Sequence, residues 1–166
     1  MIRPDHFRLV GAHGIGNPRS QIAQSMCYFK GHLYMGITHP KGEGPRDAAR
    51  ILRYQPTSDS WDVVHVSPLV DADENAIVKD VYRGESGMYL GSLDEDTVQV
   101  PRNRGYRCMT RFQKQGEESD ILFVSTISHW GSQLLYSVDG KNFAVAPPPD
   151  LSSGEELSFR AILTPT

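Results

Sequence analysis

The stretch Tyr54-Gln55-Pro56-Thr57-Ser58-Asp59-Ser60-Trp61 is the most informative part of this chain. It joins two short strand-like runs, at 50–54 before the turn and at 63–66 after it. Because proline, serine and aspartate favour tight turns, the whole segment predicts a β-hairpin. The aromatic residues at its two ends, Tyr54 and Trp61, can then meet across the strands and cover one face of a small sheet.

A second copy of this arrangement lies further along the chain. The run 132–136 ends in Tyr136, and Phe143 follows seven residues later, as Trp61 follows Tyr54. Two short β runs precede each hairpin, at 26–29 and 33–35 in the first copy and at 109–112 and 122–124 in the second. Self-similarity on this scale indicates a repeat architecture.

The first hairpin resembles the Kelch repeat of β-propellers. Tyr54, Pro56 and Trp61 occupy the fixed positions of the Kelch turn Tyr-x-Pro-x-x-x-x-Trp. The Gly-Gly doublet of Kelch repeats is replaced by Gly36-Ile37 in the first copy and by Ser125-Thr126 in the second. The resemblance implies an all-β fold of β-propeller blades, each a four-stranded antiparallel sheet. Propellers of this kind are mostly rigid platforms that bind other proteins, although a fold alone does not fix a function.

The second turn, from Ser137 to Phe143, resembles the Asp box of sialidase-type propellers. It is one residue shorter than that motif and ends in phenylalanine. Its Asp139 and Gly140 suit a turn because glycine accepts positive φ and the carboxylate accepts backbone N–H bonds. In sialidases the Asp box is structural and lies far from the catalytic centre, so the resemblance supports a propeller and implies no glycosidase activity.

The repeats divide the chain into five expected segments. Complete propellers have about four to eight blades, whereas two blades are clear in this sequence. The predicted fold is therefore all-β, with blades that are incomplete or are completed by oligomerisation. The expected segments are an N-terminal arm (1–20), a first Kelch-like blade (21–68), an insertion or degenerate blade (69–105), a second blade (106–150) and the start of a further blade (151–166).

Composition limits the classes of partner. The chain has 166 residues and a net charge of −3, which argues against a nucleic-acid partner. No apolar run approaches the ~20 residues of a membrane span, and the N-terminus lacks the apolar core of a signal peptide. The acidic turn 71–75 lacks the glycine and glutamate that complete a calcium loop. We therefore predict a cytoplasmic protein with no cofactor, no metal and no membrane or nucleic-acid partner, in which Cys27 and Cys108 are free thiols.

Two histidines that follow predicted inner strands are the candidate binding residues. His39 lies at this place in the first blade, and His129, with Trp130 beside it, lies there in the second. In a propeller these positions open onto the surface where ligands usually bind. Histidine can transfer protons and tryptophan can stack on a ligand, while Arg107 or Arg111 can hold an anionic group. Two histidines without a third ligand are not a metal signature, and exposed loop histidines without a ligand are the favoured alternative.

Three functions are compatible with the sequence. The leading expectation is a non-catalytic scaffold that binds another protein chain or further copies of itself. The first alternative is a hydrolase or lyase acting on a small or carbohydrate-like substrate at the channel mouth, with His129 as acid/base and His39 assisting. The second alternative is a carbohydrate-binding module in which Trp130 forms the stacking surface.

Overall fold

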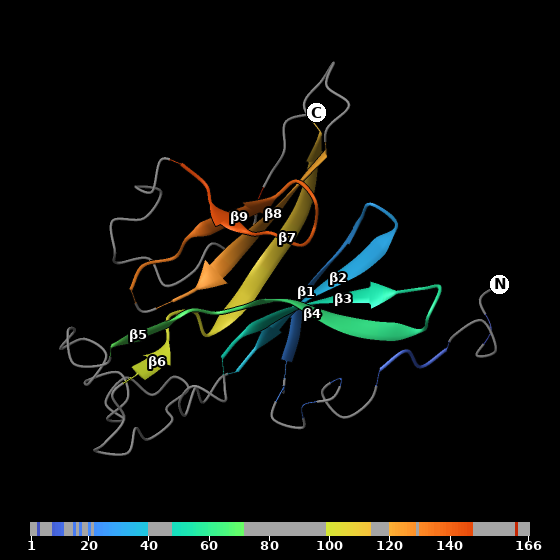
Figure 1. Ribbon diagram of the computed structural model, residues 1–166, viewed down its shortest axis with the longest axis horizontal. Coiled ribbons are helices and arrows are strands. Elements are labelled where there is room, and N and C mark those ends of the chain that lie inside the picture. The colour runs from blue at the N-terminus through green and yellow to red at the C-terminus, as the bar shows by residue number, and fades with distance from the viewer. Residues whose placement is uncertain are drawn as a thin grey trace.

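The computed structural model describes residues 3, 8–11, 15, 17, 20, 22–39, 48–71, 99–113, 120–128, 130–147 and 162. These residues form ten strands and no helix (Figure 1). The strands build two four-stranded antiparallel sheets and one two-stranded sheet. The prediction of an all-β protein is therefore confirmed for the described part of the chain, and none of its three sheets closes on itself.

The first sheet is a meander with the strand order β1-β2-β3-β4. Its strands are β1 (Ile22–Phe29), β2 (His32–Thr38), β3 (Arg50–Gln55) and β4 (Ser60–Val66). A two-residue turn joins β1 to β2, and both of its residues, Lys30 and Gly31, have positive φ (46° and 81°). Such a pair of left-handed residues matches the right-handed twist of the two strands that it connects.

The second sheet repeats this meander. Its strands are β7 (Gly105–Gln113), β8 (Asp120–Ile127), β9 (Leu134–Ser137) and β10 (Ala144–Val145), in the order β10-β9-β8-β7. Between the two meanders, β5 (Leu69–Asp71) pairs with β6 (Gln99–Pro101). Each meander therefore begins with a long strand and continues outward through sequential neighbours.

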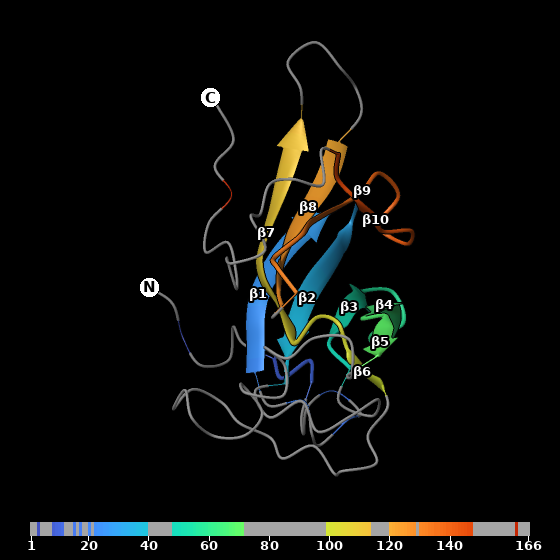
Figure 2. The same cartoon turned by 90° about the vertical axis from the view of Figure 1, so that its left-hand side faces the viewer.

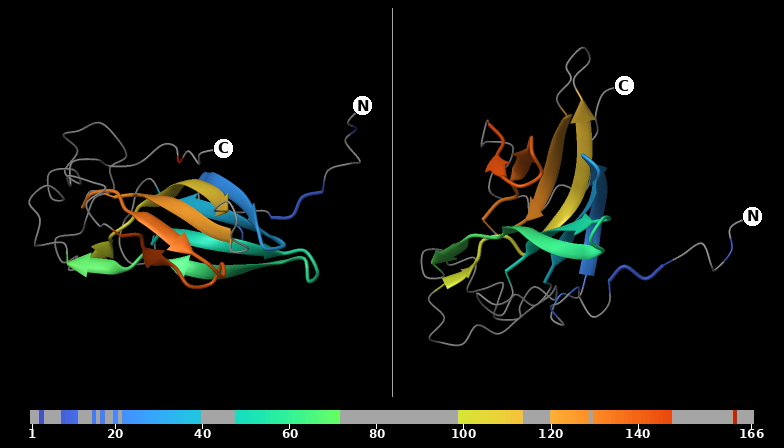
Figure 3. Two further views of the ribbon diagram at one scale, coloured as in Figure 1. Left: turned by 90° about the horizontal axis from the view of Figure 1, so that it is seen from above. Right: turned by 45° about the vertical axis from the view of Figure 1, so that its right-hand side comes forward.

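The hydrophobic core lies between the two four-stranded sheets, which pack face to face with β7 against β1 and β2 (Figure 2). Figure 3 shows the same two layers from above and in an oblique view. Full burial of one large apolar side chain contributes about 1.5–3 kcal/mol to stability. Because the two sheets bury their core residues against each other, each sheet depends on the other for its stability. The core residues are Phe29, Tyr34, Ala49 and Ile51 on one side and Tyr106, Met109, Leu122, Val124 and Leu135 on the other.

Polar contacts also join the two sheets. The hydroxyl of Ser25 in β1 donates a hydrogen bond of 2.7 Å to the carbonyl oxygen of Tyr106 in β7. At the end of β2, the backbone N–H of His39 donates to the carbonyl oxygen of Arg104 at 2.9 Å. The first sheet is thus held against the start of β7 at two places along its length.

The opposite face of the first sheet, which we call the outward face, has its own small cluster. Met35, Ile37 and Leu52 are buried there and pack against Ile15 and Trp61. Because Ile15 precedes β1, the part of the chain before the first strand contributes to the cover of this face.

Several predicted features lie partly or wholly outside the described residues. Only 69–71 and 99–105 of the expected insertion at 69–105 are described, as is residue 162 of the expected further blade at 151–166. His129 also lies outside the described residues. Among the described residues there is no helix with the length and apolar character needed to cross a bilayer.

Candidate functional site

The hairpin that opened the sequence analysis lies on the outward face of the first sheet. Tyr54 in β3 and Trp61 in β4 are cross-strand partners, and their ring centroids are 5.2 Å apart with the rings tilted by 45°. Asp59, in the turn between them, has a positive φ of 51°. Aspartate tolerates this left-handed conformation better than most residues, and here its carboxylate faces the hairpin aromatics.

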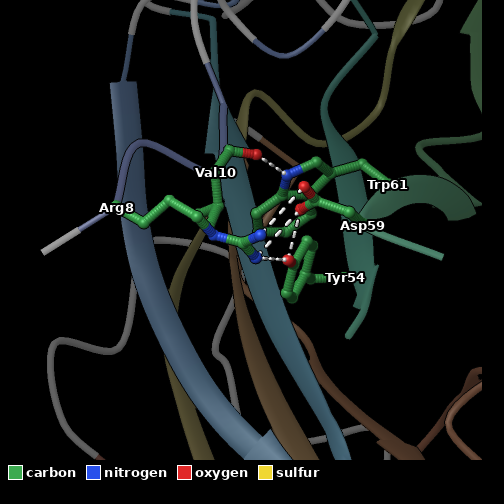
Figure 4. A network of polar contacts seen from close by, with 5 residues as sticks. All are labelled: Arg8, Val10, Tyr54, Asp59 and Trp61. Carbon is green, nitrogen blue, oxygen red and sulfur yellow. Dashed lines mark hydrogen bonds and ion pairs between the residues drawn. The ribbon is translucent and has the colours of Figure 1, made fainter. Parts of the chain in front are cut away.

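A segment before β1, residues 8–11, binds to this hairpin (Figure 4). The guanidinium of Arg8 donates to the hydroxyl of Tyr54 at 2.6 Å and to both carboxylate oxygens of Asp59 at 3.1 Å. The indole Nε1 of Trp61 donates to the backbone carbonyl of Val10 at 2.7 Å. The hydrogen bond between the Tyr54 hydroxyl and Asp59 raises the pKa of Tyr54. The segment is therefore fastened to the sheet by both charged and backbone contacts.

The cover of the outward face is incomplete. Met35 and Leu52, in the central strands, are only 6% and 4% exposed. The residues along the outer strands of the same face are open, with Met26 53%, Tyr28 64% and Val63 50% exposed. We call these three residues the outward patch. Large apolar side chains gathered on one face, with polar contacts beside them, are typical of a protein-interaction site.

The Asp-box-like turn is built as the sequence predicts. The Asp139 carboxylate accepts the backbone N–H groups of Lys141 and Asn142, each at 2.8 Å, and the side-chain amide of Asn142 at 2.7 Å. Ser137 accepts the N–H of Gly140 at 2.9 Å. These bonds, first of all that from the Asn142 backbone, hold the pKa of Asp139 well below its usual range. Among the described residues, the hydrogen-bond partners of Asp139 lie within its own turn, so these bonds stabilise the turn.

The second hairpin differs from the sequence prediction by one residue. The strand register pairs Tyr136 with Ala144, so Phe143 and Tyr136 are not cross-strand partners as Tyr54 and Trp61 are. Phe143 instead contacts His65 of β4, with ring centroids 5.3 Å apart. The ring of Phe143 therefore packs between the two sheets.

An aromatic cluster around His65 joins the sheets and was not found by sequence reasoning. The His65 ring makes an edge contact with Tyr106, with centroids 5.7 Å apart, in addition to its contact with Phe143. Burial lowers the pKa of His65 and raises the pKa of Tyr106. Nothing in the alternating run that contains His65 marks it as an inter-sheet residue, because its contacts come from the other repeat.

The structure places His39 inside the protein. Its side chain is 2% exposed, and its backbone N–H is bonded to the carbonyl oxygen of Arg104. The N–H of Arg104 donates in turn to the carbonyl oxygen of Ile127, the last residue of β8. The ends of β2 and β8 are thus brought together at Arg104, and His39 faces protein rather than solvent.

Trp130 is held close to this junction by its backbone. Its N–H donates to the hydroxyl of Ser128 at 3.2 Å, and its carbonyl oxygen accepts from the guanidinium of Arg102 at 3.2 Å. The same guanidinium donates to the carbonyl oxygen of Gly131 at 3.2 Å. Trp130 is therefore half-buried and is held by backbone hydrogen bonds to Ser128 and Arg102.

Of the two candidate anion-binding arginines, Arg111 lies away from this junction. Arg111 forms a cross-strand ion pair with Asp120, with 2.9 Å between Nε and Oδ2. It lies six residues beyond the first residue of β7, which is about 20 Å along an extended strand. Arg107 is half-buried near the start of β7. Arg111 therefore lies away from His39 and Trp130, whereas Arg107, the other candidate, is only three residues from Arg104 at the junction.

The described residues also bear on metal and thiol chemistry. They contain no group of three or more histidine, cysteine, aspartate or glutamate side chains that could hold a metal ion. Cys27 and Cys108 are free thiols, and burial raises the pKa of Cys27. Comparison of the chain with protein-family models, curated proteins and solved structures finds no match.

Proposed function

We propose that this chain is a non-catalytic protein-interaction module made of two successive propeller-like blades, and that it binds protein through the outward face of its first sheet. The observation that carries the proposal is the outward patch: Met26, Tyr28 and Val63 are each at least half exposed on a face whose centre is already apolar. Two four-stranded meanders stacked face to face support the blade interpretation. A third sheet placed on the outward face would bury the patch as the core buries the inward face.

The composition of the patch suits protein recognition. Aromatic residues and methionine are enriched at the centres of protein interfaces, where water is excluded. Tyr28 adds a hydroxyl that can keep a polar contact at the rim, and Met26 adapts its shape to the surface it meets. Burial of apolar surface gains roughly 25 cal/mol per Å², so three large side chains provide a useful but modest driving force.

The hydrolase or lyase alternative finds less support in the described residues. Its assisting residue, His39, is 2% exposed and cannot reach a substrate dissolved in water. That alternative therefore depends on His129, which lies outside the described residues. The carbohydrate-binding alternative depends on Trp130, whose indole is half-buried.

Site-specific photo-crosslinking tests the proposed function. Tyr28 is replaced by a benzophenone-bearing phenylalanine in the full chain, and crosslinked species are isolated from the producing cells and identified by mass spectrometry. Val138 is the matched control, because it is 51% exposed but lies in the turn of the second sheet. We expect a discrete protein adduct from position 28, which the added substitution Met26→Lys removes, and none from position 138. Absence of an adduct at position 28, or equal adducts at both positions, would overturn the proposal.

A further inference from the structure

The two four-stranded sheets can be aligned residue by residue through their β-bulges. In β1 the pairing with β2 shifts at Gln24, opposite Gly36-Ile37. In β7 the pairing with β8 shifts at Arg107, opposite Ser125-Thr126. These two dipeptides are the pair that the sequence analysis placed at the Kelch doublet. A bulge occupies one defined position in the pairing of two strands. We therefore match the bulged residue Gln24 with the bulged residue Arg107, and the strand pairing then matches the remaining residues of the two sheets.

This alignment identifies one apolar row that runs across both sheets. The row begins two residues after the bulge, at Met26 in β1 and at Met109 in β7. It continues across the other three strands of each sheet through the residues that are paired with one another. Every residue of the row is aliphatic or methionine in both sheets. The row is Met26, Met35, Leu52 and Val63 in the first sheet and Met109, Val124, Leu135 and Val145 in the second.

The row faces in opposite directions in the two sheets. In the second sheet, Met109 and Val124 point into the core and touch the first sheet. In the first sheet, the corresponding Met26 and Met35 belong to the outward face. The two sheets therefore pack front to back, so that unlike faces meet.

Front-to-back packing leaves two unlike faces at the ends of the stack. The outward face of the first sheet carries the row that begins with Met26, in which Met26 and Val63 are exposed. The outward face of the second sheet carries the half-buried Phe123 and Tyr136, which correspond to Tyr34 and Arg53 on the inward face of the first sheet. The outward face of the first sheet corresponds to the inward face of the second sheet, and the outward face of the second sheet corresponds to the inward face of the first. The two end faces are therefore equivalent to the two faces that already pack against each other inside the molecule. A contact of this type is heterologous and joins copies head to tail.

We propose that the outward face of the first sheet binds the outward face of the second sheet of another copy of this chain, in competition with segment 8–11. This inference rests on the proposed function and names its partner. Propellers hold about four to eight sheets, and two sheets from each copy would complete such a ring with about two to four copies. The internal interface supplies the template, because it shows that these two kinds of face fit each other.

Segment 8–11 occupies the position that the neighbouring copy requires. Its bonds from Arg8 to Tyr54 and Asp59, and from Trp61 to Val10, lie on the Tyr54–Trp61 side of the outward face. The ion pair between Arg8 and Asp59 is exposed, with 63% and 54% of the two side chains open to solvent, so it holds the segment weakly. Loss of this ion pair would release segment 8–11 and so favour binding of the neighbouring copy to the outward face.

The first test measures the mass of the purified full chain by light scattering over a range of concentrations. We expect concentration-dependent assembly, which Met26→Lys abolishes while leaving the circular dichroism spectrum unchanged. Arg8→Ala should raise the association constant about two- to fivefold, the value of one exposed ion pair. Val138→Lys, which places the same charge at a similarly exposed site, should have no effect. A monomer at all concentrations in the wild type and in Arg8→Ala would overturn the proposal.

The second test establishes which faces meet. Inside the molecule, Ser25 lies against Tyr106, and the corresponding residues on the two end faces are Cys108 and Ala23. In a chain with Cys27 replaced by serine, Ala23→Cys should form a disulfide with the native Cys108 of another copy when oxidised glutathione is added as the oxidant. Mass spectrometry of the linked peptides identifies the bond, and Cys108→Ser should remove it. A bond between two copies of position 23, or no bond between copies, contradicts head-to-tail packing.

The two proposals fail in different ways. If the purified chain stays monomeric and forms no bond between positions 23 and 108, the partner is not a second copy. If position 28 still crosslinks to a different, identified protein in cells, the interaction function stands without self-assembly. If position 28 crosslinks to nothing, the interaction function itself fails.

Discussion

Gly36 of β2 lies against the backbone of Tyr106 in β7, so closely that a Cβ atom on Gly36 would be 2.6 Å from the Tyr106 carbonyl oxygen. Real Cβ atoms essentially never approach so closely, and the obstructing atom belongs to the backbone. The absence of a side chain at Gly36 is therefore what allows the two sheets to meet along β2 and β7.

Gly36→Ala should destabilise the protein by about 1–3 kcal/mol, the usual cost of overpacking a well-filled interior. The free energy of unfolding in urea measures the change. Gly31→Asn is the control, because Gly31 has a positive φ of 81° and open space around it, and asparagine tolerates that conformation. If Gly36→Ala is no more harmful than Gly31→Asn, the sheets do not touch at this point.

Leu122→Ala should lower the stability by about 2–5 kcal/mol and should weaken both sheets together. Leu122 is fully buried in the core that the two sheets share. Thermal unfolding should remain a single transition when it is followed by circular dichroism and by tryptophan fluorescence, to which Trp61 of the first sheet and Trp130, just after β8 of the second, both contribute. Val138→Ala, at an exposed position, should change stability by less than about 0.5 kcal/mol. Two separate transitions would show that each sheet folds without the other.

Asp139→Asn should destabilise the turn of the second sheet and reduce the acid sensitivity of the protein. The folded-state pKa of Asp139 is depressed, so its carboxylate stabilises the fold above the ordinary aspartate pKa of about 3.9 and loses this effect as the pH falls further. Thermal melts between pH 6 and pH 3 should fall more steeply for the wild type than for the variant. Parallel slopes in Asp139→Asn and the wild type would refute this assignment.

His65 should make the fold less stable as the pH falls from 7.5 to 5.5. Burial lowers the folded-state pKa, so the unfolded chain takes up a proton near pH 6.5 while the folded chain does so only at lower pH. Proton uptake by the unfolded state therefore favours unfolding in this range. Titration of the His65 imidazole by NMR should give a midpoint below 6.5, and His65→Gln should flatten this part of the stability profile. A midpoint at or above 6.5 would contradict the burial described here.

The sequence predicted the structure best at turns, where a residue type such as aspartate or glycine favours one particular local conformation. The aromatic ends of the Tyr54–Trp61 hairpin and the acceptor role of Asp139 follow from turn chemistry, which acts over a few residues. The offset in the second hairpin could not be seen in this way. Tyr136 has the same spacing to Phe143 as Tyr54 has to Trp61, but the register of β9 with β10 depends on the whole sheet.

Contacts between the repeats were beyond the reach of the sequence. His65 meets Tyr106 and Phe143 only because two sheets pack face to face, and no local pattern encodes that packing. The burial of His39 has the same origin, since the loop before β7 bonds to its backbone. The sequence analysis placed Arg8 in an N-terminal arm (1–20) and predicted no contact for it. In the structure, Arg8 bonds to Asp59 and so holds this part of the chain against the first sheet.

The position of segment 8–11 also has a consequence during synthesis of the chain. Ribosomes release the N-terminal residues first, so the segment is already outside when Tyr54 and Trp61 emerge and can cover them at once. The inward face, with Tyr34 and Ile51, must wait until β7 and β8 have been translated. A nascent chain paused after β4 therefore exposes the apolar residues of its inward face to water until the second sheet covers them.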